Sequence, residues 1–316
     1  MEKRISPPRN RLKRRNDFAR NFPLVMLMIP GIIVLIINNY LPMLGVVIAF
    51  KKLDYRRGFL GGDWVGFDNF EFFLKTTYAP VILRNTILYN LAFIAVGTCF
   101  SVAIAIALNE IKNKRTKKIY QSIMILPYFL SWIVASYIGL AIMGGKTGFI
   151  NSKILAPLGL DPIQFYLEKK YWPFILVFAN IWKYGGYNAV VYLAAVAGLN
   201  TEYYEAAAID GANRWKQIKH ITLPLLTPVI IIMVLLQIGK IFNADFGLFY
   251  LFPMDSGPLY DVTNVIDTYV YRAMTTGISD FSMAAAVGLF QSVVGLIFIL
   301  SSNAIVNKID PEKGMF

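Results

Sequence analysis

The stretch Thr201–Pro224 decides the fold of this chain and reads TEYYEAAAIDGANRWKQIKHITLP. It lies between two long apolar segments and carries acidic, basic and amide side chains that are costly to place in a lipid bilayer. A polar segment in this position must lie in water between two membrane spans. Its ordered sequence predicts that it docks onto something there.

The composition of the whole chain indicates a membrane protein. Of its 316 residues, 56% are hydrophobic and only 16% are charged, whereas soluble domains have about 25% charged residues. The apolar residues form long blocks, as membrane-spanning helices require. We therefore predict an all-α integral membrane protein.

The charge and the cysteine count exclude several classes of function. The net charge is +12, but the basic residues cluster beside apolar blocks, which is typical of the positive-inside rule rather than of a nucleic-acid partner. Cys99 and His220 are the single cysteine and histidine, so an internal disulfide is impossible and a His/Cys metal site is nearly excluded. We expect neither nucleic acid, nor a metal, nor another cofactor on this chain.

The apolar blocks predict six transmembrane helices. They lie at about residues 22–50, 85–108, 119–143, 173–199, 225–252 and 282–306. Pro127 lies inside the third block and predicts a kink. The interval 51–84 is predicted to form a polar loop.

The domain organisation follows from these blocks. Residues 1–21 form a basic tail predicted to contact anionic lipid, 22–306 form the transmembrane domain, and 307–316 form a short C-terminal tail. More Lys and Arg lie on the side of the N-terminal tail than on the other side, so both termini and the stretch 201–224 are predicted to be cytoplasmic.

Local signals within 201–224 predict an elbow of two short helices. Asn200 or Thr201 can cap a helix over 202–209, and acidic residues in its first turn suit the positive end of the helix dipole. Gly211 permits a tight turn. A second short helix over 212–220 follows, and Pro224 marks the start of the next span. The alternative is an ordinary amphipathic linker at the membrane surface.

The spacing of these residues resembles the EAA loop of ABC importer permeases. The matching residues are Glu205-Ala206-Ala207, Asp210-Gly211-Ala212 and Ile221-x-Leu223-Pro224. Further matches to sugar-importer permeases lie at Tyr40-x-Pro42-Met43, Ala49-Phe50, Trp64-Val65-Gly66 and Asn69-Phe70. The stretches 261–272 and 286–292 are similar to the branch of that family that takes complex oligosaccharides.

The resemblance implies a type I ABC importer permease fold in the bacterial plasma (inner) membrane. It implies a second homologous permease, two cytoplasmic ATPase subunits that bind ATP and Mg, and an extracytoplasmic solute-binding protein. The chain itself is then not an enzyme. The implied ATPase-coupling residues are Glu205, Ala206, Ala207, Asp210, Gly211, Leu223 and Pro224. Among them, Glu205 faces a basic group of the ATPase, the two alanines pack in its cleft, and Gly211 makes the turn.

Polar residues inside the fourth and fifth blocks are candidates for the substrate pathway. They are Asn180, Lys183, Tyr184, Tyr187, Gln237, Lys240, Asn243 and Asp245. The first four share one helical face. Either these side chains line the path of a sugar, or they make hydrogen bonds between helices together with a Lys240–Asp245 charge pair. The two lysines could also meet acidic sugars such as uronates.

Two other classes of function remain as alternatives. An ion-coupled secondary transporter would need acidic groups in the membrane for coupling, and Asp245 is the single candidate. A membrane enzyme would need a His/Cys set, paired intramembrane acids or a nucleophile motif, and the sequence has none of them. The sequence does not name the sugar, its length or its charge.

Overall fold

The computed structural model describes residues 11–54, 56–75, 77–275 and 281–310. Parts of the two predicted tails, residues 1–10 and 311–316, lie outside the described residues. The first helix, α1 (Arg11–Leu35), begins within the predicted basic tail. It continues through η1 (Ile36–Tyr40), α2 (Leu41–Met43) and η2 (Leu44–Phe50).

The rest of the described chain is mainly helical. The α-helices are α3 (Asp68–Lys75), α4 (Ala79–Glu110), α5 (Lys114–Phe129), α6 (Trp132–Met143), α7 (Trp172–Ala197), α8 (Glu202–Ile209), α9 (Arg214–Gln217), α10 (Leu223–Ile238), α11 (Tyr260–Thr263), α12 (Ile266–Thr275) and α13 (Phe281–Ile309). Short π or 3-10 turns are η3 (Ile150–Leu155), η4 (Ala156–Leu158), η5 (Lys169–Tyr171), η6 (Ile218–Thr222), η7 (Gly247–Leu251) and η8 (Gly257–Leu259).

Four helical stretches are long and apolar enough to cross a membrane. They are Asn21–Phe50, Ala79–Glu110, Arg214–Ile238 and Phe281–Lys308, and the bent pair α5–α6 makes a fifth if it counts as one span. Helix α7 is 26 residues long, about 39 Å at the usual rise, but polar residues such as Asn180 and Lys183 interrupt its apolar surface. The count of six spans stays a prediction.

The predicted kink in the third apolar block is present and sharp. Helices α5 and α6 are bent by 99° at the break between them. Leu130 and Ser131 are extended there, and the Ser131 hydroxyl accepts a hydrogen bond from the amide of Val134 at 3.3 Å, which caps α6. Pro127 lacks an amide hydrogen, so it weakens the last turn of α5 just before the break.

The predicted fifth span, 225–252, has different bounds. The helical stretch already begins at Arg214 and ends at Ile238. The predicted second helix of the elbow is therefore continuous with this span. A π turn at η6, in which the amide of Leu223 donates to the carbonyl of Ile218, keeps the chain helical up to Pro224, where a missing amide is tolerated.

The predicted polar loop 51–84 contains regular structure that the sequence analysis missed. Strands β1 (Lys51–Asp54) and β2 (Gly58–Trp64) form an antiparallel hairpin with Lys51 opposite Trp64. The amide of Leu53 donates to the Ser282 hydroxyl at 3.0 Å, which fastens the hairpin to α13. The all-α prediction is therefore correct apart from this hairpin.

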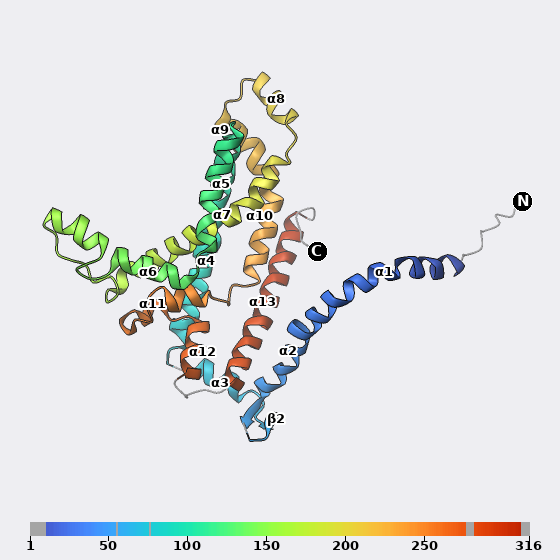
Figure 1. Cartoon of the computed structure of the whole chain (residues 1–316), viewed down its shortest axis with the longest axis vertical. Helices are drawn as coiled ribbons and strands as arrows, with labels where there is room; N and C mark the ends of the chain where they lie inside the picture. The colour runs from blue at the N-terminus through green and yellow to red at the C-terminus, as the bar shows by residue number, and fades with distance from the viewer. Residues whose placement is uncertain (1–10, 55, 76, 276–280, 311–316) are drawn as a thin grey trace, which may run out of the picture.

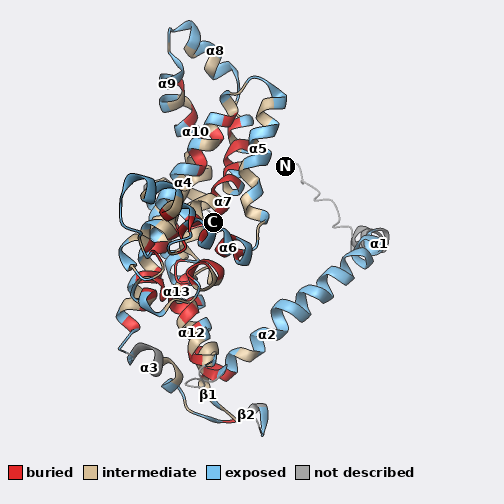
Figure 2. Cartoon of the chain, turned by 60° about the vertical axis from the view of Figure 1, so that its left-hand side comes forward, coloured by how far each residue is buried: buried red, intermediate tan, exposed pale blue. Residues whose placement is uncertain are grey.

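The helices form an elongated bundle. Helices α4 and α7 share the most extensive helix–helix contact, and α10 packs beside α7 and α13. The α8–α9 elbow lies at one end of the molecule, and β2 and α3 lie at the opposite end (Figure 1). Buried residues concentrate in the middle of the bundle (Figure 2), around side chains such as Trp172, Leu176 and Phe249.

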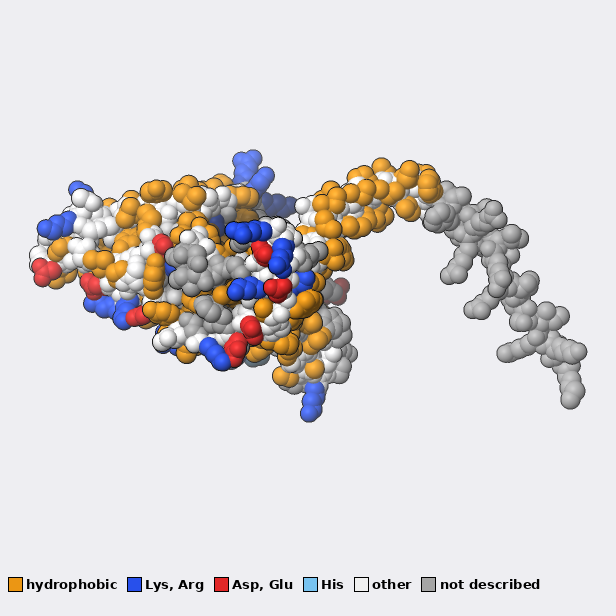
Figure 3. Space-filling model, turned by 90° about the horizontal axis from the view of Figure 1, so that it is seen from below, with side chains coloured by type: hydrophobic (Ala, Val, Ile, Leu, Met, Phe, Trp, Pro, Cys, Tyr) orange, Lys and Arg blue, Asp and Glu red, His pale blue; other side chains and the backbone are white. Residues whose placement is uncertain are grey.

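Helix α1 projects from this bundle. Every residue from Asn21 to Leu44 is exposed, and this part of the chain extends away from the body as a rod of hydrophobic side chains (Figure 3). Such a surface is not stable in water. It must be covered by lipid or by another membrane subunit.

Candidate functional site

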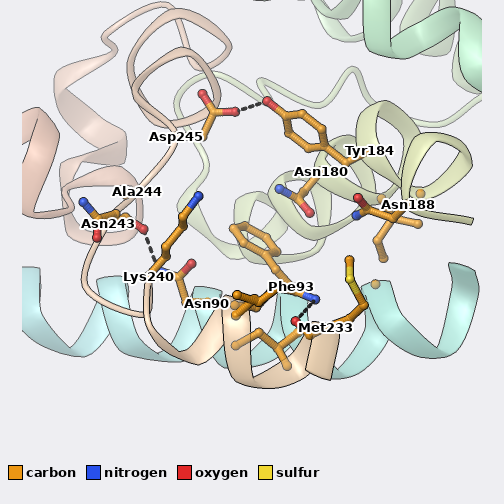
Figure 4. Close-up of a pocket in the computed structure, with 16 residues that line it drawn as sticks. Asn90, Phe93, Asn180, Tyr184, Asn188, Met233, Lys240, Asn243, Ala244 and Asp245 are labelled. Atoms are coloured by element: carbon orange, nitrogen blue, oxygen red, sulfur yellow. Dashed lines mark hydrogen bonds between the residues drawn. The ribbon is translucent and has the colours of Figure 1, made fainter. Parts of the chain in front are cut away.

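A cavity with polar side chains in a largely apolar lining lies between α4, α7, α10 and the segment that follows α10. We call it the inner cavity; its volume is about 620 Å³. Its polar lining residues are Asn90, Asn180, Tyr184, Asn188, Gln237, Lys240, Asn243 and Asp245. Several of them face the same space from different helices (Figure 4).

The inner cavity brings together most of the predicted pathway residues. Six of the eight line it, and the two that do not are Lys183 and Tyr187. Asn90 and Asn188 were missed by the sequence analysis. Their signal was an amide side chain within an apolar block, and Asn188 lies four residues after Tyr184, on the same helical face.

Lys183 has a role at the α5–α6 break instead. Its side chain is buried, with 5% of its surface exposed. Its ammonium group donates to the main-chain carbonyls of Tyr128, at 3.2 Å, and of Leu130. It also lies 5.2 Å from the centre of the Trp132 ring. A cation at the end of a helix satisfies carbonyls that have no partner within the helix.

Tyr187 is also engaged in packing. Its ring stacks on that of Tyr128, with 4.0 Å between the centroids and 6° between the planes. Tyr128 lies in the last turn of α5. Lys183 and Tyr187 therefore hold the broken helix against α7, which leaves them outside the cavity.

Asp245 has both carboxylate oxygens occupied. Oδ1 accepts from the amides of Gly247, at 2.9 Å, and Leu248, at 3.3 Å. Oδ2 accepts from Trp132 Nε1 at 2.8 Å and from the Tyr184 hydroxyl at 2.5 Å. The hydrogen bonds between helices that the sequence analysis considered are thus present. The predicted Lys240–Asp245 ion pair is not found among the described residues.

Lys240 is the free cation of the inner cavity. Within the described part of the chain, its ammonium group has no hydrogen bond or ion pair, and it extends into the space that Asn180 also faces (Figure 4). The side-chain amides of Asn180 and Asn188 are likewise unpaired among those residues. The cavity therefore offers amide donors and acceptors, a phenol and one available positive charge.

The elbow has the turn that the sequence predicted. Helix α8 covers 202–209 as expected. Gly211 has φ = +78°, and the amide of Ala212 donates to the carbonyl of Ala207 at 2.8 Å, a pattern that closes a helix at a left-handed residue. The side chain of Asn213 then caps α9 by accepting from the amide of Lys216 at 3.0 Å.

Three residues that the sequence analysis did not single out fasten the elbow. The hydroxyls of Tyr204 and Thr222 are 2.9 Å apart and share a hydrogen bond. The side-chain amide of Gln217 donates to the main-chain carbonyls of Tyr204, at 3.4 Å, and Ala212, at 3.3 Å. Gln217 and Thr222 are buried. The elbow is thus tied to the start of α10.

The predicted coupling residues lie on the accessible side of the elbow. Glu205, Ala206, Asp210, Gly211, Leu223 and Pro224 are exposed, and Ala207 is half-buried. Glu205 also lines a groove of about 630 Å³ between α8 and α9. At the tip, Ile209 is 87% exposed and Trp215 is 79% exposed, so the end of the elbow presents apolar surface to a partner.

The described residues contain no group of three His, Cys, Asp or Glu side chains that could hold a metal ion.

Comparison with known proteins agrees with this architecture. The chain is 37% identical over 294 residues to Protein LplB of Bacillus subtilis (strain 168), covering 93% of this chain and 91% of LplB. It is 32% identical over 296 residues to the polygalacturonan/rhamnogalacturonan transport system permease protein YteP of the same organism, covering 93% and 90% of the two chains.

Solved structures show the same fold. One chain of a bacterial ABC transporter involved in the import of the acidic polysaccharide alginate superimposes with a TM-score of 0.83 and 30% identity, covering 94% of this chain and 99% of that one. A bacterial alginate ABC transporter in complex with an alginate pentasaccharide-bound periplasmic protein gives a TM-score of 0.81 at 30% identity, covering 93% and 97%.

The family model extends over both sites. Residues 97–312, which include the elbow and most of the inner cavity, match the model described as "binding-protein-dependent transport system inner membrane component". The resemblance seen in the sequence is thereby confirmed, and the chain belongs to the family of inner membrane components of binding-protein-dependent transport systems.

Proposed function

We propose that this chain is a permease subunit of an ABC importer for an oligosaccharide or a polysaccharide fragment. The observation that carries the proposal is the inner cavity, which places amides, a phenol and a lysine between apolar helices. Polar groups at that depth are costly, so they usually face a water-filled cavity or one another and mark a substrate pathway. Sugar hydroxyls are matched by amide side chains, and sugar-ring faces by aromatic rings. Relatives named for polygalacturonan/rhamnogalacturonan and alginate support a saccharide substrate.

The ammonium group of Lys240 in the inner cavity, unpaired among the described residues, favours a uronate-containing sugar. Asp245 is occupied by four hydrogen bonds and Lys183 by two carbonyls, so neither is free to meet a substrate. Lys240 remains as an available cation. A carboxylate of the substrate would gain a charge-assisted hydrogen bond from it, and this type of bond is stronger than a neutral one.

The elbow is proposed to transmit force from two cytoplasmic ATPase subunits, which bind ATP and Mg. Glu205 and Ala206 are exposed on α8, and Gln217 and Thr222 fasten α8 to the start of α10. A push on the elbow would therefore reach the helix that lines the inner cavity. This linkage supports alternating access by rigid-body movement of the spans.

The projecting α1 supports a second permease subunit. Within Asn21–Phe50 only Ile48 and Ala49 are buried by this chain, so the opposite surface must come from lipid or from another membrane protein. We place the elbow and both termini in the cytoplasm, and β1, β2 and α3 on the side from which a solute-binding protein delivers the sugar.

Reconstitution tests the proposal. The chain would be assembled in proteoliposomes with its partner permease, ATPase subunits and binding protein, and ATP hydrolysis would be measured against a panel of ligand-loaded binding proteins. We expect hydrolysis to rise with one class of oligosaccharide and to need all the subunits. Sugar uptake by this chain alone, driven by a sodium or proton gradient, would overturn the proposal in favour of an ion-coupled secondary transporter.

A further inference from the structure

The chain leaves helical geometry between α10 and η7, in the middle of the bundle. We call residues 241–246 the strap. Asn243, Ala244 and Asp245 have no regular secondary structure. Main-chain groups of an irregular segment at membrane depth must find partners outside a helix, because lipid offers none. The side chains that supply these partners therefore decide where the strap lies.

Three helices supply those side chains. Asn90 of α4 donates to the carbonyls of Ile241, at 3.0 Å, and Asn243, at 3.1 Å. Gln291 of α13 donates to the carbonyl of Phe242 at 2.6 Å. Asp267 of α12 accepts from the amide of Ala244 at 2.8 Å. Gln291 also donates to Asp267 at 3.3 Å, so the two side chains act as one unit.

Residues of the strap line two cavities. Asn243, Ala244 and Asp245 line the inner cavity. The next residue, Phe246, lines a second cavity of about 340 Å³, together with Asp267, Tyr271 and Gln291. We call this second space the outer cavity. Helix α12, which forms one of its walls, lies toward the end of the molecule that carries α3 and β2 (Figure 1).

Both ends of the strap are held by close packing. Before it, Gly239 approaches α13 so closely that a Cβ on Gly295 would lie 2.4 Å from the carbonyl oxygen of Gly239. After it, a Cβ on Gly247 would lie 2.0 Å from the Trp132 ring. The ends are therefore fixed against α13 and α6. The middle is held by the hydrogen bonds to Asn90, Asp267 and Gln291.

We propose that the strap is the barrier between the inner and outer cavities and that Asp267 and Gln291 form its latch. This inference rests on the proposed transport function. Both latch residues lie on the outer side and hold the strap through Ala244 and Phe242. When the latch releases, the middle of the strap moves while its ends stay packed, and the two cavities join into one path. Asp267 and Gln291 are positioning residues, because they act through the strap.

Accessibility of the inner cavity tests the latch directly. The native Cys99 is replaced by serine, and Asn188→Cys places a single thiol in the inner cavity. The fully assembled complex in proteoliposomes is treated with a membrane-impermeant maleimide from the side of the binding protein, without ATP. We expect slow labelling with the native latch. We expect labelling about tenfold faster with Asp267→Ala, since a charge-assisted hydrogen bond is lost.

Control variants distinguish the loss of the latch from a general loss of folding or assembly. Asp267→Asn keeps an oxygen that can accept from Ala244, so its labelling rate should stay near that of the native latch. Arg56→Cys, in the exposed β1–β2 turn, should label at one rate in every background. If Asp267→Ala does not assemble, Gln291→Ala carries the same test, because it removes the hydrogen bond to Phe242.

Equal labelling of Asn188→Cys with and without the latch, in complexes that elute intact, would overturn the proposal. The measurement needs no substrate, so it is independent of the sugar assignment. Latch-dependent labelling in a complex that imports no oligosaccharide would support the strap as a barrier and overturn the proposed substrate.

Discussion

The ammonium group of Lys183 donates a hydrogen bond to the main-chain carbonyl of Leu130, at the break between α5 and α6. The same lysine holds the carbonyl of Tyr128 and lies against the Trp132 ring. Trp132 in turn donates to Asp245, which borders the inner cavity. One buried cation thus links a broken helix to the wall of the cavity.

Replacing Lys183 should therefore damage stability. Lys183→Met fills a similar volume but leaves two carbonyls without a partner, at a cost of about 1–3 kcal/mol. We expect the purified complex to lose its monodisperse elution at a lower temperature. Lys240→Met, at the exposed lysine of the cavity, is the control and should leave that temperature nearly unchanged. An unaltered melting temperature for Lys183→Met would contradict the capping role.

Replacing Lys240 should change substrate selection. Lys240→Gln removes the available cation, so uptake of a uronate oligosaccharide should fall about tenfold, in line with the loss of a charge-assisted hydrogen bond. Uptake of a neutral oligosaccharide of equal length should change little. Lys240→Arg keeps the charge and should retain most uronate uptake. Equal losses for both sugars would remove the acidic-sugar hypothesis.

At position 211 the backbone conformation, rather than the size of the side chain, should decide which substitutions retain coupling. Gly211 has φ = +78° and no neighbour that a Cβ would meet within 4 Å. Gly211→Val introduces a β-branched residue that resists this conformation, and we expect ATP hydrolysis to lose its coupling to transport. Gly211→Asn, which tolerates positive φ, should retain coupling. Transport that survives Gly211→Val unchanged would refute the role of the turn.

Gly295 should be intolerant of even one methyl group. A Cβ there would lie 2.4 Å from the carbonyl oxygen of Gly239, so Gly295→Ala must push α13 from α10. We expect a loss of thermal stability of about 1–3 kcal/mol. Gly288→Ala, about two turns earlier on the same helix, meets nothing within 4 Å and should be tolerated. Equal melting temperatures for Gly295→Ala and Gly288→Ala would contradict the close approach of Gly295 to Gly239.

Tyr166 offers a substitution that should stabilise the protein. Its hydroxyl is buried without a hydrogen-bond partner among the described residues, and burial raises the pKa of this phenol to about 12. Tyr166→Phe removes the unpaired group, and we expect stability to rise by about 1 kcal/mol. Tyr184→Phe removes the hydrogen bond to Asp245 and should lower the stability. The two changes in melting temperature should therefore have opposite signs.

Much of the elbow could be predicted because its signals are local. Residues 202–209 carry helix-forming residues with acids in the first turn, and Gly211 permits positive φ. These preferences act over a few residues, so α8 and its turn follow from the sequence. The fastening of α8 through Tyr204, Gln217 and Thr222 could not be predicted, because it depends on how the chain folds back after the turn.

The sequence by itself determined the membrane class, the apolar blocks, the kink near Pro127 and the turn at Gly211, because hydropathy and turn chemistry are properties of neighbouring residues. Only the tertiary structure decided what the polar residues inside the blocks do. Lys183 and Lys240 look alike in the sequence, yet one is held by carbonyls 53 and 55 residues away and the other faces a cavity. Helical periodicity places a side chain on a face, but the segments that pack against that face decide whether the charge is satisfied or free.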